Sequence, residues 1–229
     1  LAGAAERADE LDTTSADLLE SARVDAESFD VPVETHTVVS HRGFEEIFDA
    51  ARTYDADMVV MGWGPDSHGS PGRAESALDE VSGNIPCDFL VLKDRGFDPS
   101  RILVPTAGGP DSDLSATVAK LLQSQYDAEV TLLHVADDEA TGERFLEEWA
   151  TDHDLADAHL RVETGDVEDA IERAATDASM VVIGATEQGL LSRLVRGSLV
   201  LDIVDDVDCS VLLAEKHRRR SLWQRLFGN

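Results

Sequence analysis

The sequence predicts an α/β fold made of two tandem units, each an open, mostly parallel sheet with helices on both faces. Short apolar strands alternate with helical patterns along the chain, which is typical of parallel sheets whose crossover helices cover both faces. Segments of the chain recur at a fixed offset of 122 residues, which indicates a duplicated domain. The first unit lacks the elements that open the second, so only the second is complete.

The repeat is clearest over two strands and the loop between them. Val59–Trp63 (VVMGW) aligns with Val181–Ala185 (VVIGA), and Cys87 and Cys209 lie 122 residues apart. A strand, a loop serine and a second strand keep this offset without a gap, which chance matches would not do. We therefore expect an incomplete first domain over residues 1–95, a complete second domain over residues 99–215 and a basic tail over residues 216–229.

The complete copy is expected to hold five strands separated by four helices. It opens with the strand Arg101–Pro105 (RILVP) and a Gly-rich turn, after which Asp111 and its neighbours begin a helix. The apolar positions of that helix are Leu114, Val118, Leu121 and Leu122. The later elements are a strand at Glu129–Ala136, a helix at Glu139–His153, a strand at His159–Glu163, a helix with Val167, Ala170, Ile171 and Ala174 on one face, a strand at Met180–Gly184, a helix at Ser198–Val207 and a strand at Ser210–Ala214.

The first copy is expected to lack two strands and a helix at its front. Its elements are a helix at Ser15–Phe29, a strand at Glu34–Ser40, a helix at Phe44–Thr53, a strand at Met58–Gly62, a helix at Glu75–Val81 and a strand at Phe89–Leu92.

The formal charge of −28 and the presence of only three lysines indicate a protein adapted to molar salt, where self-repulsion is screened. We therefore expect a halophilic source, and the charge disfavours binding to nucleic acid. No apolar run approaches the length of a membrane span, so we expect a cytoplasmic polypeptide, in which Leu1 starts a piece of something longer. Cys87 and Cys209 are interpreted as small buried residues. The histidines lack metal-site spacing and no acid–base pair stands out, which favours a protein that is not an enzyme and holds no metal.

A Gly-rich loop follows the strand Met180–Gly184 and runs to Ser198, where a helix is predicted to begin. In doubly wound sheets, ligands bind beyond the carboxyl ends of the strands. Glycines let backbone N–H groups approach an anion, and a helix N-terminus adds a partial positive charge, so the loop can hold a phosphate. The alternative is that the glycines merely allow the turn and Ser198 merely caps the helix.

The strand, the loop and the serine resemble the universal stress protein family, whose phosphate loop has the form G-x2-G-x9-G-S/T. Gly184, Gly197 and Ser198 match at the family spacing, and Glu187 stands in place of the middle glycine. The resemblance covers the second copy and what is left of the first. It implies ATP or AMP in the second domain, with the adenosine side lined by Pro105, Thr106, Ala107 and Val135 and the phosphate side by Gly184, Thr186, Gly197 and Ser198.

Two departures from the family pattern oppose nucleotide binding. Ala107 stands where many binders have an acidic residue, and the Glu187 carboxylate would repel a phosphate, although Arg193 and Arg196 could offset it. In the first copy, Pro65 and Glu75 replace the second and third glycines, so no nucleotide is expected there.

We therefore expect a non-enzymatic regulatory or sensory module that forms a homodimer. The narrower resemblance is to the cytoplasmic C-terminal modules of haloarchaeal amino-acid permease-like transporters. The alternatives are a free-standing tandem stress protein and a dimerisation scaffold that binds no nucleotide. The basic amphipathic tail, residues 216–229, is suited to an anionic membrane surface, with docking onto the acidic body or disorder as alternatives.

Overall fold

The computed structural model describes residues 16–36, 44–62, 85–184 and 206–217. The chain divides into two compact units, Leu1–His41 and Arg42–Asn229, which are described separately. The helix predicted at Glu75–Val81, the loop after Gly184 and the tail beyond residue 217 lie outside the described residues.

The first unit holds a helix over residues 16–27, which confirms the predicted helix there. On its surface Arg23 pairs with Glu20 at 2.6 Å and with Glu27 at 2.5 Å. Glu34–His36 are irregular and exposed, so the strand predicted from Glu34 is wrong over these residues. The reason is that a strand needs a neighbouring strand to pair with, and none of the described strands pairs with these residues.

The described strands and helices of the second unit follow one another in the predicted order. Its elements are α2 (Phe44–Thr53), β1 (Met58–Gly62), β2 (Asp88–Lys93), β3 (Arg101–Pro105), α4 (Pro110–Tyr126), β4 (Glu129–Val135), α5 (Glu139–Asp152), β5 (His159–Glu163), α6 (Val167–Ala175), β6 (Met180–Gly184) and β7 (Ser210–Glu215). The predicted strands of this unit agree with the structure to within one residue at each end.

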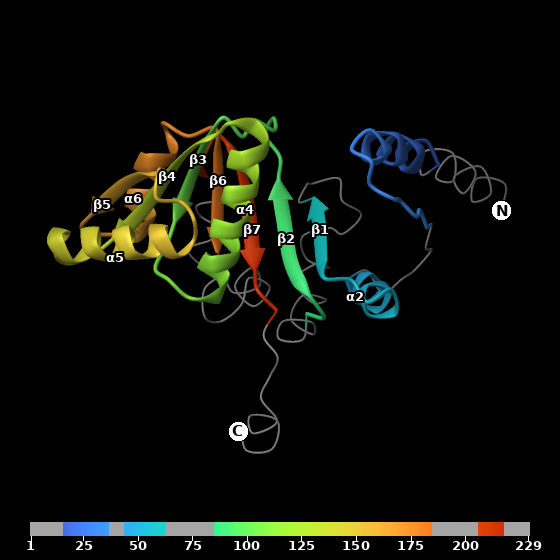
Figure 1. Cartoon of the computed structure of the whole chain (residues 1–229), viewed down its shortest axis with the longest axis horizontal. Helices are drawn as coiled ribbons and strands as arrows, with labels where there is room; N and C mark the ends of the chain where they lie inside the picture. Colours follow the sequence, from blue (N-terminus) through green and yellow to red (C-terminus); the bar gives the residue numbers. More distant parts are fainter. Residues whose placement is uncertain (1–15, 37–43, 63–84, 185–205, 218–229) are drawn as a thin grey trace, which may run out of the picture. The chain divides into compact units, whose positions relative to one another are not determined.

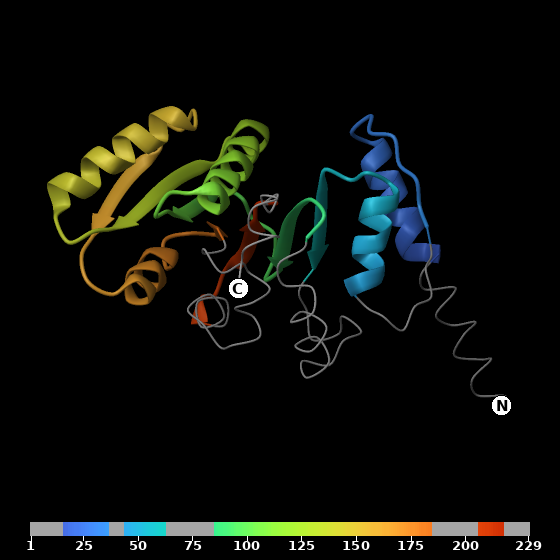
Figure 2. The ribbon, with the colours of Figure 1, turned by 90° about the horizontal axis from the view of Figure 1, so that it is seen from below.

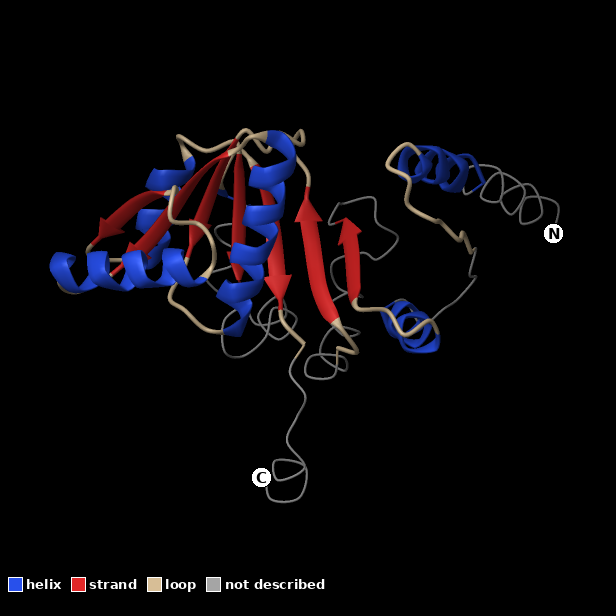
Figure 3. Ribbon diagram, in the orientation of Figure 1, coloured by secondary structure: helices blue, strands red, loops and turns tan. Residues whose placement is uncertain are grey.

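All seven of these strands form one sheet in the order β1-β2-β7-β6-β3-β4-β5 (Figure 1). Neighbouring strands are parallel except β2 and β7, which pair antiparallel from Phe89↔Glu215 to Lys93↔Val211. Figure 3 shows the arrows of these two strands pointing in opposite directions. The predicted α/β fold class is confirmed, and the structure adds that the strands of the two copies join edge to edge.

The ends of the β2–β7 junction are tied in a reciprocal way. At the start of β2, the Asp88 carboxylate accepts hydrogen bonds from Lys216 Nζ at 2.6 Å and from the His217 backbone N–H at 2.9 Å. At the start of β7, the Ser210 hydroxyl accepts a hydrogen bond from the Arg95 backbone N–H at 3.0 Å. Each copy therefore holds the residues that follow the last strand of the other.

Helices cover both faces of the sheet, with α4 and α5 on one face and α6 on the other (Figure 2). Alternate residues of β3 serve the two layers: Ile102 and Val104 pack under α4 and α5, whereas Leu103 faces the α6 side. On that second side, Phe48 of α2 meets Phe89 of β2 with ring centroids 5.6 Å apart. The side-chain alternation of the strands thus builds two apolar layers.

The predicted apolar face of α4 is wrong at Leu121, which is exposed. The small residues Ser115, Ala116 and Ala119 are buried instead, and they let α4 approach the sheet closely. This rotates Leu121 toward solvent. Val167, at the first position of α6, is also exposed although it was predicted to face the core.

Among the described residues, no helix combines the length and the apolar character that a membrane span requires.

Candidate functional site

The carboxyl ends of β3, β4 and β6 meet at one edge of the sheet, where ligands bind in doubly wound folds. Pro105 lies in register with Leu133, and on the other side β3 pairs with β6 from Ile102↔Met180 onward. This arrangement brings together five of the residues predicted to line the site, namely Pro105, Thr106, Ala107, Val135 and Gly184. The other three, Thr186, Gly197 and Ser198, lie outside the described residues, as do Glu187, Arg193 and Arg196.

The turn after β3 is held by hydrogen bonds that centre on the buried Thr106. Its backbone N–H donates to the Leu133 carbonyl at 2.8 Å, and its hydroxyl accepts from the Gly108 N–H at 3.1 Å. Its carbonyl lies 2.8 Å from Nδ1 of His134. Because a carbonyl can only accept, Nδ1 of His134 carries the hydrogen. The turn is therefore fixed by the protein alone.

Phe145 of α5 completes this turn, and the sequence analysis did not single it out. Its ring stacks on His134 with centroids 4.3 Å apart. A Cβ built on Gly108 would lie 3.6 Å from the same ring, so the turn's backbone passes directly against it. Gly108 has a φ of +79°, which glycine adopts readily. The aromatic spacing of Phe145 and Trp149 was the available sequence signal, since residues four apart share a helix face.

Gly184 ends β6 at a point where the backbone of α4 comes very close. A Cβ at this position would lie 2.6 Å from the carbonyl carbon of Asp111 and 2.7 Å from the N atom of Ser112. Asp111 is buried, and its Oδ1 accepts a hydrogen bond from the Lys216 N–H at 2.8 Å, just after β7. Packing of α4 against β6 thus demands glycine at 184, with or without a ligand.

A negative charge is fixed in the loop after β4. The carboxylate of Asp138 caps α5 and accepts from the Thr141 hydroxyl at 2.6 Å and from the Thr141 N–H at 2.8 Å. These hydrogen bonds, chiefly that of the hydroxyl, lower the pKa of Asp138, so it is ionised at neutral pH. Ala107 on the neighbouring turn is exposed and supplies no carboxylate.

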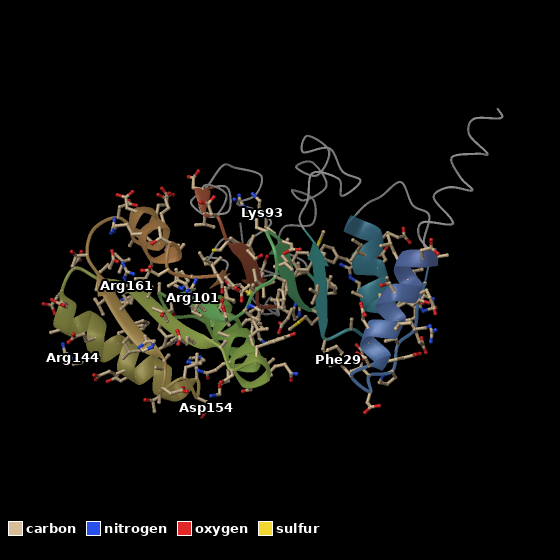
Figure 4. All side chains as sticks on the ribbon, turned by 90° about the horizontal axis from the view of Figure 1, so that it is seen from above. Phe29, Lys93, Arg101, Arg144, Asp154 and Arg161 are labelled. Atoms are coloured by element: carbon tan, nitrogen blue, oxygen red, sulfur yellow. The ribbon has the colours of Figure 1, made fainter. Side chains whose placement is uncertain are left out.

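A cavity of about 330 Å³, which the sequence did not predict, lies at the opposite ends of these strands, where β3 and β4 begin. Arg101, Thr131 and Arg161 line it together with the acids Glu129 and Asp177. Figure 4 labels Arg101 and Arg161 on this part of the sheet.

Arg161 of this lining also pairs with Glu163 at the carboxyl end of β5, and Glu163 pairs in turn with Arg173 of α6, both at 2.5 Å. Hydrogen bonding by Arg173, followed by that of Arg161, lowers the pKa of Glu163.

Among the described residues, no cluster of three or more His, Cys, Asp or Glu side chains is placed to hold a metal ion. Cys87 is buried as predicted, whereas Cys209 is only partly buried. Burial raises the pKa of both thiols, which keeps them in the unreactive protonated form.

Comparison with known proteins identifies relatives of the whole chain. The profile of the universal stress protein family matches residues 1–93 and 99–215. A universal stress protein from Archaeoglobus fulgidus DSM 4304 is similar in structure, with a TM-score of 0.63 and 17% identity, covering 91% of this chain and 78% of that one.

Two further solved structures share the fold. The cytoplasmic domain of a prokaryotic cation chloride cotransporter has a TM-score of 0.61 at 12% identity, covering 86% of this chain and 79% of that one. A putative universal stress protein from Pseudomonas aeruginosa UCBPP-PA14 has a TM-score of 0.56 at 17% identity, covering 88% of this chain and 78% of that one. No curated protein matches the sequence.

Proposed function

Because the chain belongs to the universal stress protein family, we propose that it is a non-enzymatic regulatory module that responds to ATP or AMP through its second domain. The domains in this proposal are residues 1–95, residues 99–215 and a basic tail at residues 216–229. The first domain binds no nucleotide in this proposal, because Pro65 and Glu75 stand where the phosphate loop needs glycines.

The observation that supports this proposal most is the ordered turn after β3. The Thr106 carbonyl, hydroxyl and N–H all have partners within the protein, and Phe145 packs against the turn. A site that is already ordered loses little conformational entropy when it binds its ligand. In this proposal Pro105, Thr106, Ala107 and Val135 contact the adenosine, with Phe145 as an additional apolar wall.

The phosphates are assigned to Gly184, Thr186, Gly197 and Ser198. A glycine-rich loop that leads into a helix N-terminus favours an anion. The carboxylate of Glu187 opposes it by about 1 kcal/mol at 4 Å even in water. The affinity should therefore depend on a neutralising charge, from a cation in the salt-rich solution or from Arg193 and Arg196.

The regulatory step is a shift between two conformations of the loop that follows β6. A nucleotide that binds one of them better raises its population and changes the surface that the loop presents. The homodimer expected from the sequence is the assembly that would read this change.

The second part of the proposal attaches the module to an amino-acid transporter at the cytoplasmic face of the membrane. Support comes from the resemblance to haloarchaeal permease-like proteins and from the cotransporter cytoplasmic domain, which has the same fold. In that setting the basic tail, residues 216–229, meets anionic lipid. A free-standing tandem protein and a scaffold without nucleotide are the alternatives. Apolar spans encoded directly upstream of Leu1 would support attachment, and a stop codon there would refute it.

Calorimetric titration of ATP and of AMP into the protein in molar KCl tests the nucleotide site. We expect saturable binding at one site per chain. Gly197→Glu should abolish it, because the carboxylate would lie where the phosphates bind. Glu75→Gln, at the matching position of the first copy, is the control and should leave binding unchanged. Absence of saturable binding to the unaltered protein would contradict the nucleotide proposal and leave the scaffold.

A further inference from the structure

One face of β1 is bare where the matching face of β6 is covered. In β6, Met180 and Val182 are 1% and 0% exposed. In β1, Met58 and Val60 occupy the same positions 122 residues earlier and are 39% and 63% exposed. The two strands have nearly the same sequence, MVVMG and MVVIG, so the difference in burial comes from their neighbours.

The neighbours of β6 are β3 and α4. β3 pairs in parallel with β6 at Ile102↔Met180 and Leu103↔Val181. α4, which follows β3 directly, lies on the same face as Met180 and Val182 and packs with them in one apolar cluster. β1 pairs with β2 and with no other described strand, so its second edge is free of any described partner.

The end of β1 carries a further sign of the same missing neighbour. Gly184 must be glycine because the first turn of α4 comes within 2.6 Å of where its Cβ would lie. Gly62 occupies the matching position of β1, yet no atom of a described residue lies within 4 Å of the point where its Cβ would be. Among the described residues, no helix therefore contacts Gly62 in the way that α4 contacts Gly184.

We infer that the bare face and free edge of β1 bind a strand–helix segment, built like Arg101–Tyr126, that precedes residue 1 in the natural polypeptide. The strand would pair in parallel with β1, with its counterpart of Ile102 opposite Met58. The helix would begin against Gly62 and cover Met58 and Val60. Small residues on its inner face would allow the close approach that Ser115, Ala116 and Ala119 give α4.

The order of elements assigns the segment to the same polypeptide. In the complete copy, the β3–α4 segment precedes β4, α5, β5 and α6, and β6 follows them. In the first copy, the helix over residues 16–27 and α2 precede β1, as α5 and α6 precede β6. The counterpart of β3–α4 therefore belongs upstream of both. This inference is independent of nucleotide binding.

Thiol labelling of two matched variants tests the inference. Val60→Cys places a thiol on the bare face, and Leu121→Cys places one on the outside of α4, where the native side chains are 63% and 65% exposed. Mass spectrometry separates these sites from Cys87 and Cys209. In residues 1–229 alone, both thiols should react at similar rates. In the full natural polypeptide, Val60→Cys should react at least about tenfold more slowly than Leu121→Cys, because it is reached only by local opening.

Three results would overturn the inference. The first is an equal labelling ratio of the two variants in the full polypeptide and in residues 1–229. The second is a natural reading frame that begins at residue 1. The third is a protection of Val60→Cys in residues 1–229 that increases with protein concentration, accompanied by a dimer in sedimentation. That result would mean that a second copy of the chain covers the bare face.

Discussion

β1 and β6 are the same strand in two different surroundings. They share four of five residues, differing only at Met61 and Ile183. β6 lies between β3 and β7 under α4, and it is buried along most of its length, whereas β1 has β2 on one side and alternates between exposed and half-buried positions. Local sequence therefore makes the strand, and the neighbouring elements decide how much of it is buried.

The comparison also shows what the duplication contributes to the sheet. β2 and β7 are the last strands of the two copies, and each would otherwise be an edge strand. Because they pair antiparallel with each other, neither β2 nor β7 is an edge strand. Hydrogen bonds to Asp88 at one end of the pair and to Ser210 at the other hold the two strands together. The free edges of the combined sheet are then β1 and β5 among the described strands.

The largest contrast is expected from truncating the two matched methionines. Met180→Ala should lower the free energy of unfolding by about 2–5 kcal/mol, because it opens a cavity in a packed layer. Met58→Ala should lower it by under about 1 kcal/mol, because the side chain is already half in solvent. Urea unfolding of both variants at the same salt concentration measures the difference. Similar losses in the two variants would mean that β1 is covered as fully as β6.

A smaller contrast is expected at the two glycines that end these strands. Gly184→Ala should cost about 1–3 kcal/mol, because its methyl group would overlap the backbone of α4 and force it to move. Gly62→Ala should be neutral or should stabilise the chain by about 0.4–1 kcal/mol, because the space is open and alanine lowers the entropy of the unfolded state. Thermal unfolding of the pair checks the sign. A loss in Gly62→Ala as large as that in Gly184→Ala would show that a helix already packs there.

Much of the fold was predictable, because strands that are covered on both faces are runs of branched apolar residues. Polar residues or glycines before and after each run mark where the strand begins and ends. β3, β5 and β6 have the predicted bounds for this reason. The joining of the two sheets was not predicted, because backbone pairing between β2 and β7 has no side-chain signature. The exposure of Leu121 was missed because it depends on how closely the small residues of α4 approach the sheet.

The candidate site divides in the same way. Thr106, Val135 and Gly184 could be placed at one edge because the carboxyl ends of parallel strands meet there. The contact of Phe145 with the turn could not, because it depends on the distance between α5 and β4. Nor did the sequence distinguish a glycine that admits a phosphate from one that admits a helix, and at Gly184 the packing of α4 already accounts for the residue.

The central claim is that the second copy is complete and the first is not. Amide hydrogen exchange of β1 and β6, measured in residues 1–229, tests it most directly. The strand Met180–Gly184 lies between β3 and β7, so its amides should exchange only through global unfolding. Among the described strands, Met58–Gly62 pairs with β2 alone, so its amides should exchange at least about tenfold faster, because local opening of an edge strand is sufficient. Equal protection of the two strands would contradict the account, since it would show that β1 is already paired and covered in this chain.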